Sequence, residues 1–202
     1  MIPPVIQCPY CRTALTEASP ACPSCQLDLE RANKVMGPIP LLSGSGLTVL
    51  TQSLDGAGER PMIRRLQAFH RRFPQCRVHV LVARFPEAFP PASYLFWLFN
   101  SGGLSEAGHI RGKNRDLLVG IDPFLQNAGL IVGYGLEPFL SQAALDRTVA
   151  EAVPKLQAGD LSGGVIEIID GLSELMEDVC RELPAMLGLE KELTVENTGG
   201  DF

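Results

Sequence analysis

Four cysteines near the start of the chain occur in two identical frames, Cys-Pro-Tyr-Cys at residues 8–11 and Cys-Pro-Ser-Cys at residues 22–25. Two thiolates separated by two residues can bind one metal ion through a tight turn, and two such turns complete the tetrahedral four-sulfur site that zinc prefers. Because four thiolates leave no coordination position open, such an ion would be structural rather than catalytic. We therefore expect a structural Zn²⁺ bound by Cys8, Cys11, Cys22 and Cys25.

Disulfide bonds and an iron centre are the alternatives for these cysteines. Residues 1–6 contain neither the basic region nor the long apolar region of a signal peptide, so we expect a cytoplasmic chain with reduced thiols. Iron-tetrathiolate turns typically place glycine after the second cysteine, whereas Arg12 and Gln26 follow here, which favours zinc.

The segment around the four cysteines has too few large apolar residues to build a core of its own. Between residues 5 and 29 they are Val5, Ile6, Tyr10, Leu15, Leu27 and Leu29. A bound metal ion can supply the missing folding energy, about 10–16 kcal/mol for structural zinc. Residues 1–30 are therefore expected to form a zinc ribbon.

The composition limits the class of protein. The chain has 202 residues, 46% of them hydrophobic, which fits one ordinary domain with a small appendage. The net charge of −6 argues against a large non-specific nucleic-acid surface. No apolar run reaches the roughly 18–20 residues that span a bilayer, so we expect no membrane span.

Beyond the ribbon, clusters of glycine and proline predict a linker at residues 31–46, and strands then alternate with helices. Strands are expected at residues 47–50, 77–83, 116–121 and 129–132, and helices at residues 60–73, 94–99, 141–154 and 161–183. Ser141 is expected to cap the helix that follows it, and prolines at 154 and 184 are expected to end the last two helices.

This order of elements predicts an α/β fold: a small amino-terminal zinc ribbon plus an α/β sandwich domain at residues 47–183. We expect a mixed, partly parallel sheet with helices on both faces. In the strand at 77–83, Val78, Val80 and Val82 should point to one face, and Leu81 and Ala83 to the other. Residues 184–202 are expected to form a polar tail.

The string Gly-Tyr-Gly-Leu-Glu at residues 133–137 is followed by Pro154, by Ala-Gly-Asp at 158–160 and by Gly-Gly at 163–164. Together these residues resemble the TPM domain family over roughly residues 47–182. The resemblance implies a doubly wound α/β sandwich. It also implies either acid phosphatase activity or an accessory role, and in some members divalent cations bound by loop carboxylates.

Three residues form a possible ligand loop: Asp122, Tyr134 and Glu137. Glycines on both sides of Tyr134 permit a positive φ or a close backbone approach, and Glu137 precedes a predicted helix. Together with Asp122 or Asp116, Glu137 could hold Mg²⁺ or Ca²⁺. Both aspartates cannot join it, because a strand separates them by roughly 20 Å at about 3.3 Å per residue. The simpler interpretation is that these carboxylates cap and solvate loop ends.

Three functions are compatible with this sequence. The favoured one is a cytoplasmic zinc-binding interaction or accessory protein, with a protein partner and no clear catalytic centre, because no known nucleophile motif stands out. The first alternative is a metal-assisted phosphatase of the TPM type, so enzymatic activity is left open. The second is a nucleic-acid-binding zinc-ribbon protein, suggested by the basic residues Arg60, Arg64, Arg65, Arg71, Arg72 and Arg77.

Two further features bear on these alternatives. The histidines are dispersed, and His79 lies in an apolar strand, where a hydrogen-bonded core residue is the expected outcome. His109 lies in a glycine-containing loop and is expected to be exposed. The aromatic segment at residues 85–100 is the expected source of a partner surface, although core packing explains it more simply.

Overall fold

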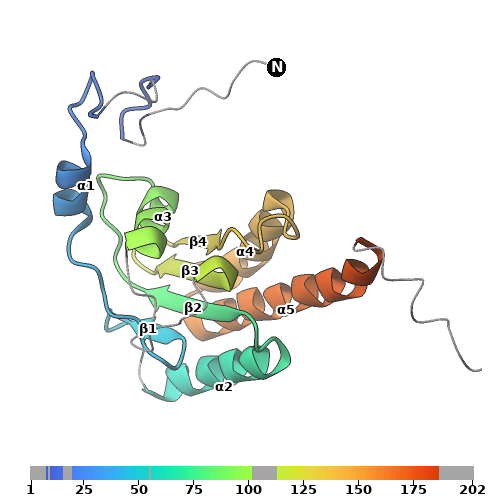
Figure 1. Cartoon of the computed structure of the whole chain (residues 1–202). Helices are drawn as coiled ribbons and strands as arrows, with labels where there is room; N and C mark the ends of the chain where they lie inside the picture. Colours follow the sequence, from blue (N-terminus) through green and yellow to red (C-terminus); the bar gives the residue numbers. More distant parts are fainter. Residues whose placement is uncertain (1–7, 9, 16–19, 55, 102–112, 187–202) are drawn as a thin grey trace, which may run out of the picture.

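The computed structural model describes residues 8, 10–15, 20–54, 56–101 and 113–186. In this part of the chain one sheet has the order β1-β2-β3-β4 (Figure 1). Its strands are β1 (Leu47–Val49), β2 (Arg77–Val82), β3 (Asp116–Asp122) and β4 (Asn127–Val132). The first three strands are parallel and β4 is antiparallel to β3, so the sheet is mixed, as predicted.

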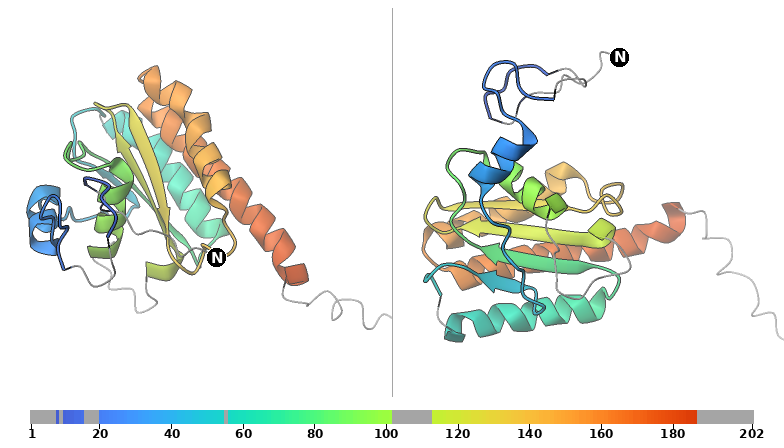
Figure 2. Two further views of the ribbon diagram at one scale, coloured as in Figure 1. Left: turned by 90° about the horizontal axis from the view of Figure 1, so that it is seen from above. Right: turned by 60° about the vertical axis from the view of Figure 1, so that its left-hand side comes forward.

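Helices cover both faces of this sheet, which confirms the predicted fold class (Figure 2). One face packs against α3, and the other against α2, α4 and α5. The bounds are α1 (Leu29–Met36), α2 (Gly56–Arg72), α3 (Pro91–Ser101), α4 (Gln142–Gln157) and α5 (Leu161–Met186), with a short 3₁₀ turn at Lys113–Arg115.

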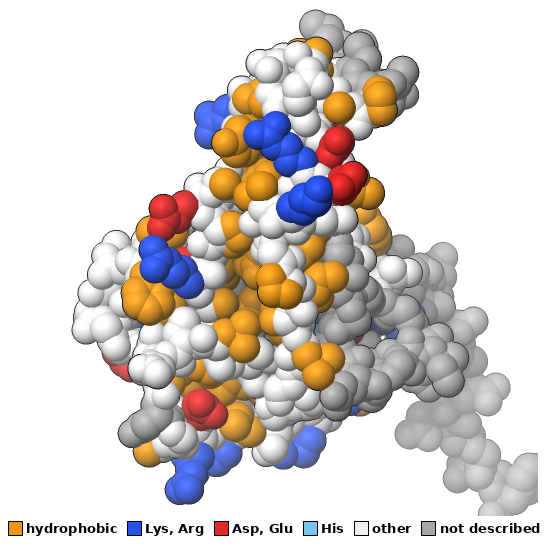
Figure 3. Space-filling model, turned by 90° about the vertical axis from the view of Figure 1, so that its left-hand side faces the viewer, with side chains coloured by type: hydrophobic (Ala, Val, Ile, Leu, Met, Phe, Trp, Pro, Cys, Tyr) orange, Lys and Arg blue, Asp and Glu red, His pale blue; other side chains and the backbone are white. Residues whose placement is uncertain are grey.

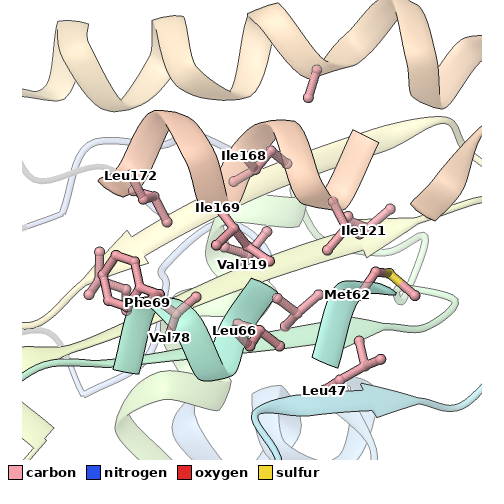
Figure 4. Close-up of a cluster of buried hydrophobic side chains, with 14 of the residues drawn as sticks. Leu47, Met62, Leu66, Phe69, Val78, Val119, Ile121, Ile168, Ile169 and Leu172 are labelled. Atoms are coloured by element: carbon pink, nitrogen blue, oxygen red, sulfur yellow. The ribbon is translucent and has the colours of Figure 1, made fainter. Parts of the chain in front are cut away.

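The larger core lies between the sheet and the helices α2, α4 and α5. Figure 4 shows side chains of α2 and α5, such as Leu66 and Ile169, pointing toward Val78 and Val119 of the strands. The predicted alternation along β2 is confirmed, because its three valines enter this core while Leu81 enters a second core beside α3. Strand β3 is buried on both faces, as a central strand should be.

The segment expected to be a linker begins with helix α1. The Asp28 carboxylate caps this helix by accepting a hydrogen bond from the Arg31 backbone N–H at 2.7 Å. Met36 is buried in the second core, and the Trp97 indole N–H donates to the Asn33 side-chain oxygen at 2.7 Å. Irregular structure therefore starts only at Gly37, whose φ of +81° ends the helix.

Two helices extend beyond the prolines at which they were expected to end. Helix α4 passes Pro154 and ends at Gln157, and α5 passes Pro184 and ends at Met186. A proline inside a helix removes one backbone hydrogen bond but does not prevent a further turn when packing compensates. In α4, Leu156 packs against the larger core beyond the proline. The predicted cap of α4 is correct, since Ser141 Oγ accepts from the Ala144 N–H.

Two further expectations concern residues outside the ranges that the structure describes. The tail at 187–202 and the loop that contains His109 lie outside the described residues. Within the described ranges, no helix combines enough length with enough apolar character to cross a membrane.

Gly120, in the middle of β3, lets helix α3 approach the sheet closely. A Cβ atom at this position would lie 2.2 Å from Leu95 Cδ2 and 2.9 Å from Phe85 Cζ. Both neighbours are buried, so neither can move freely into solvent. A glycine is therefore required by packing rather than by backbone conformation.

We predict that Gly120→Ala destabilises the domain by about 1–3 kcal/mol, because an overpacked core forces Leu95 or the backbone to shift. Urea unfolding followed by circular dichroism measures the change. Gly44→Ala is the matched control, since no atom lies within 4 Å of its added Cβ. Equal stability of the two variants would show that α3 does not press on β3.

Candidate metal centre and the two ends of the sheet

The four cysteines of the two frames form one cluster. Their sulfur atoms all lie within 4.8 Å of one another. The Sγ atoms of Cys8 and Cys25 are 3.7 Å apart, and those of Cys11 and Cys22 are 3.5 Å apart. Around a tetrahedral ion with metal–sulfur bonds of about 2.3 Å, neighbouring sulfurs lie about 3.8 Å apart. The cluster therefore fits a single bound metal ion.

Matching backbone turns bring the sulfur atoms together. The Arg12 N–H donates to the Cys8 carbonyl at 2.8 Å, and the Gln26 N–H donates to the Cys22 carbonyl at 2.9 Å. Arg12 and Gln26 have φ values of +63° and +57°, in the left-handed region that favours glycine. Each turn thus tolerates a strained residue directly after its second cysteine, and metal binding can offset that strain.

The thiols differ in how readily they release a proton. Cys11 Sγ lies 3.2 Å from the Thr13 hydroxyl oxygen, and this hydrogen bond lowers the pKa of Cys11 to about 6. Desolvation raises the pKa of Cys25 to about 12. Metal ligation requires thiolates, so binding an ion must displace protons and must weaken as the pH falls.

The cysteine cluster is attached to the sheet domain through α1 and the segment before α3. The Arg31 guanidinium of α1 donates to the Cys25 carbonyl at 3.0 Å. The rings of Tyr10 and Phe89 are 5.4 Å apart, so the first cysteine turn contacts the body directly. Helix α1 is in turn held by Trp97 of α3. The cysteine cluster is therefore joined to the sheet domain through α1 as well as through the Tyr10–Phe89 contact.

Asp122, one of the predicted ligand residues, is fully buried at the end of β3. Its Oδ2 accepts the Phe85 N–H at 2.7 Å, and its Oδ1 accepts the N–H groups of Phe124 and Leu125 at 2.9 and 3.1 Å. Both oxygens are thus occupied by backbone donors. The carboxylate fixes the β3–β4 turn to the segment that follows β2.

Tyr134 and Glu137 lie at the opposite end of the sheet. Strand β4 runs antiparallel to β3, so the loop after Val132 returns to the start of β3, where the Gly133 N–H donates to the Asp116 carbonyl at 2.9 Å. Both side chains are exposed, Tyr134 by 61%. The structure therefore brings Asp116, and not Asp122, to the end where Glu137 lies.

The sequence did not indicate a buried histidine–aspartate pair that lies at the same end of the sheet as Glu137. His79 Nε2 lies 3.8 Å from Asp116 Oδ2, and both residues are buried. Neither ring nitrogen of His79 has a hydrogen-bond partner among the described residues, whereas a hydrogen-bonded core histidine was expected. The pairing depends on the parallel register of β2 and β3, which the sequence alone does not specify.

The basic surface of α2 is partly neutralised by α5. Arg65 forms an ion pair with Asp170, and Arg72 forms one with Glu177 at 2.7 Å. Two acidic side chains of α5 therefore contact α2. These pairs remove two of the six arginines from a continuous cationic surface.

An apolar face occupies the end of the sheet where the parallel strands finish (Figure 3). A groove there has a volume of about 520 Å³ and lies between the chain after α1, the end of β1 and the β3–β4 turn. Three exposed apolar residues line this groove: Ile39, Leu50 and Phe124. We call them the apolar face. In α3, by contrast, most of the aromatic segment is buried, and Phe96 is 52% exposed.

We predict that removing the metal with a chelator unfolds residues 8–25 and leaves the sheet domain folded, because the ribbon lacks a core of its own. Limited proteolysis with mass mapping, together with amide NMR spectra, locates the loss of structure. Cys22→Ser should reproduce the effect, and Cys180→Ser, at an exposed cysteine outside the cluster, should not. Unchanged protection of residues 8–25 after chelation would contradict this prediction.

We also predict that Asp122→Asn lowers the free energy of unfolding by about 1–3 kcal/mol, because one buried backbone donor loses its acceptor. Chemical denaturation measures this loss. The control is Asp146→Asn on the exposed surface of α4, expected within about 0.5 kcal/mol of the parent. An Asp122→Asn protein with full stability would point to a ligand-binding role for this carboxylate.

Comparisons with solved structures agree with this architecture. The N-terminal domain of a protein from P. gingivalis, solved by NMR, has a TM-score of 0.56 at 21% identity, covering 67% of this chain and 84% of that one. The N-terminal domain of the cg2496 protein from Corynebacterium glutamicum has a TM-score of 0.52 at 14% identity, covering 69% and 85%. The BA42 protein from Bizionia argentinensis has a TM-score of 0.54 at 10% identity, covering 64% and 86%.

At these identities the similarity concerns the fold alone. No curated protein matches the chain significantly. The family model of the TPM domain matches residues 48–175, which is more than half of the chain and includes all of β2, β3, β4 and α4. This chain therefore belongs to the TPM domain family.

Proposed function

We propose that this chain is a cytoplasmic interaction or accessory protein that is stabilised by a structural Zn²⁺ ion and that presents its TPM domain to a protein partner. The observation that carries this proposal is the apolar face. Its three residues are 44–62% exposed, and they line one groove at the end of the sheet where the parallel strands finish. Contiguous exposed apolar surface on a water-soluble domain marks a site of interaction.

The chemistry of the four ligands supports zinc as the metal. Four thiolates at tetrahedral spacing suit zinc, and the reduced thiols that they require suit a cytoplasmic location. The ion would be held by Cys8, Cys11, Cys22 and Cys25 with no open position, so it would supply folding energy rather than chemistry.

The metal also supports the apolar face. Helix α1 follows the second cysteine turn directly and is tied to it by Arg31. Its last residue, Met36, is anchored in the core, and the next residues, including Ile39 and Pro40, line the apolar groove. Loss of the ion would therefore release one side of the proposed partner surface.

A metal-assisted phosphatase is the second candidate, and one observation favours it. The His79–Asp116 pair lies at the same end of the sheet as Glu137, and the ring nitrogens of His79 lack partners among the described residues. Asp116 and Glu137 could hold Mg²⁺ or Ca²⁺ there. We favour binding over hydrolysis because Asp122, the third candidate carboxylate, is buried and saturated by backbone donors.

Nucleic-acid binding is the least supported candidate. Its basis in the sequence is the arginine-rich helix α2, and two of those arginines are paired with carboxylates of α5. The chain as a whole carries a net charge of −6, which opposes association with a polyanion.

The test compares the full metal-loaded chain with the double variant Leu50→Ser/Phe124→Ser in cells that naturally express it. After chemical cross-linking, we expect the parent chain to recover a discrete protein partner and the variant to lose at least about tenfold of it, because two apolar contacts are removed. Leu29→Ser is the control, since Leu29 is 73% exposed but does not line the groove. Zinc is measured by elemental analysis of the same samples.

Two results would contradict the proposal. One is equal recovery of the partner by the parent chain and the double variant. The other is hydrolysis of p-nitrophenyl phosphate that requires Mg²⁺ or Ca²⁺ and that disappears in Asp116→Asn, which would establish the phosphatase in its place.

A further inference from the structure

Strand β4 forms a free edge of the sheet. It pairs with β3 on one side, and no other described strand pairs with its second side. All six of its residues are partly exposed. Figure 2 shows this edge in its left-hand view, with α3 on one side of the strand and α4 and α5 on the other.

The hydrogen bond between the Gly133 N–H and the Asp116 carbonyl fixes which backbone groups are free. Residues of an antiparallel pair alternate between bonding the neighbouring strand and pointing away from it. Given the register of β3 and β4, Gly129 and Ile131 bond β3. Ala128, Leu130 and Val132 therefore direct their N–H and C=O groups outward, and no described residue bonds those groups.

A groove of about 310 Å³ runs along this edge. One wall is formed by Phe96 and Phe99 of α3, and the other by Leu140 and Leu145 at the start of α4. Side chains of a strand alternate between its two faces, so a strand placed here would set successive residues against opposite walls. Asn100 and Gln142 add one polar side chain to each wall, and the walls are otherwise apolar, so the strand should be mainly apolar on both faces.

The edge lacks the usual protection against pairing. Natural edge strands are commonly blocked by a charged residue, a proline or a bulge. The sequence Asn-Ala-Gly-Leu-Ile-Val at residues 127–132 contains no charge and no proline. Among the residues that line the groove, the single charged one is Glu137, beyond the carboxyl end of β4.

We propose that β4 binds an extended segment of a partner protein as an added strand. The segment is mainly apolar on both faces and carries a lysine or arginine beside Glu137. Backbone hydrogen bonds to Ala128, Leu130 and Val132 provide affinity, and the two apolar walls select the side chains.

A second copy of the chain is the less favoured occupant of this edge. Helix α3 lies against both edge-side strands, since Leu95 would meet a Cβ atom at Gly120 of β3 and at Gly129 of β4. Paired β4 strands from two copies would lie about 4.8 Å apart and would have to seat two α3 helices, whose axes need about 8–10 Å between them, beside each other on one face. A single extended segment brings no helix of its own and needs no such arrangement.

This inference rests on the proposed role in protein interaction, but it uses a different surface from the apolar face. The proposed function and the proposed strand addition can therefore be contradicted by separate results. A partner lost by Leu50→Ser/Phe124→Ser and retained by a β4 variant would support the proposed function and overturn the inference made here.

The probe is a random octapeptide library displayed on phage, selected on the full metal-loaded chain and counter-selected on Leu130→Pro. This variant removes one outward N–H, and proline is tolerated where an edge strand faces solvent. We expect enriched peptides to be rich in Val, Ile and Phe with one basic residue. Enrichment of peptides that bind the parent chain and Leu130→Pro equally would overturn the proposal.

An enriched peptide is then synthesised with N-methyl groups on alternate amides. Methylation of the amides that face β4 should weaken binding by about tenfold or more, because the hydrogen bonds that these amides donate to β4 are lost. Methylation of the amides that face away from β4 should leave the dissociation constant nearly unchanged. Fluorescence anisotropy measures this constant. Equal effects of both sets would contradict strand addition.

A charge reversal tests the site without disturbing the strand. Glu137→Lys should weaken the basic peptide and strengthen a version in which glutamate replaces its basic residue. Glu151→Lys makes the same charge change on an exposed part of α4 outside the groove and should alter neither affinity. Identical binding by the Glu137→Lys and Glu151→Lys proteins would show that Glu137 does not contact the bound segment, which contradicts this part of the proposal.

Discussion

The burial of β3 dictates where the other elements of the domain lie. Every residue of this strand is buried, so helices must cover both faces of the sheet at its centre. Gly120 lets α3 approach one face closely, while Val119 and Ile121 enter the core formed with α2 and α5. A buried carboxylate at the end of such a strand needs donors, and backbone N–H groups near Asp122 supply them.

The cysteine cluster extends this arrangement beyond the sheet domain. A small segment without its own core can gain structure from a metal ion held by the four cysteines, and Arg31 joins this segment to α1. Helix α1 in turn packs on α3 through Asn33 and Trp97. Metal binding, the position of α1 and the apolar face are therefore linked by direct contacts.

The two ends of the sheet differ in chemistry because β4 reverses direction. One end carries the apolar face and the saturated carboxylate of Asp122. The other carries the exposed Tyr134 and Glu137 near the buried His79–Asp116 pair. The same reversal places β4 at the edge of the sheet between α3 and α4, where no other described strand pairs with its outer side and where we propose that an extended segment binds.

The sequence predicted the features that depend on local spacing: the two cysteine turns, the alternation of valines in β2 and the Ser141 cap. It also predicted a mixed sheet covered by helices, because alternating strands and helices admit few arrangements. It did not reveal helix α1, the donors to Asp122, the isolation of His79 or the free edge of β4. Each of these arises from segments distant in the chain, and strand direction and helix packing decide which distant groups meet.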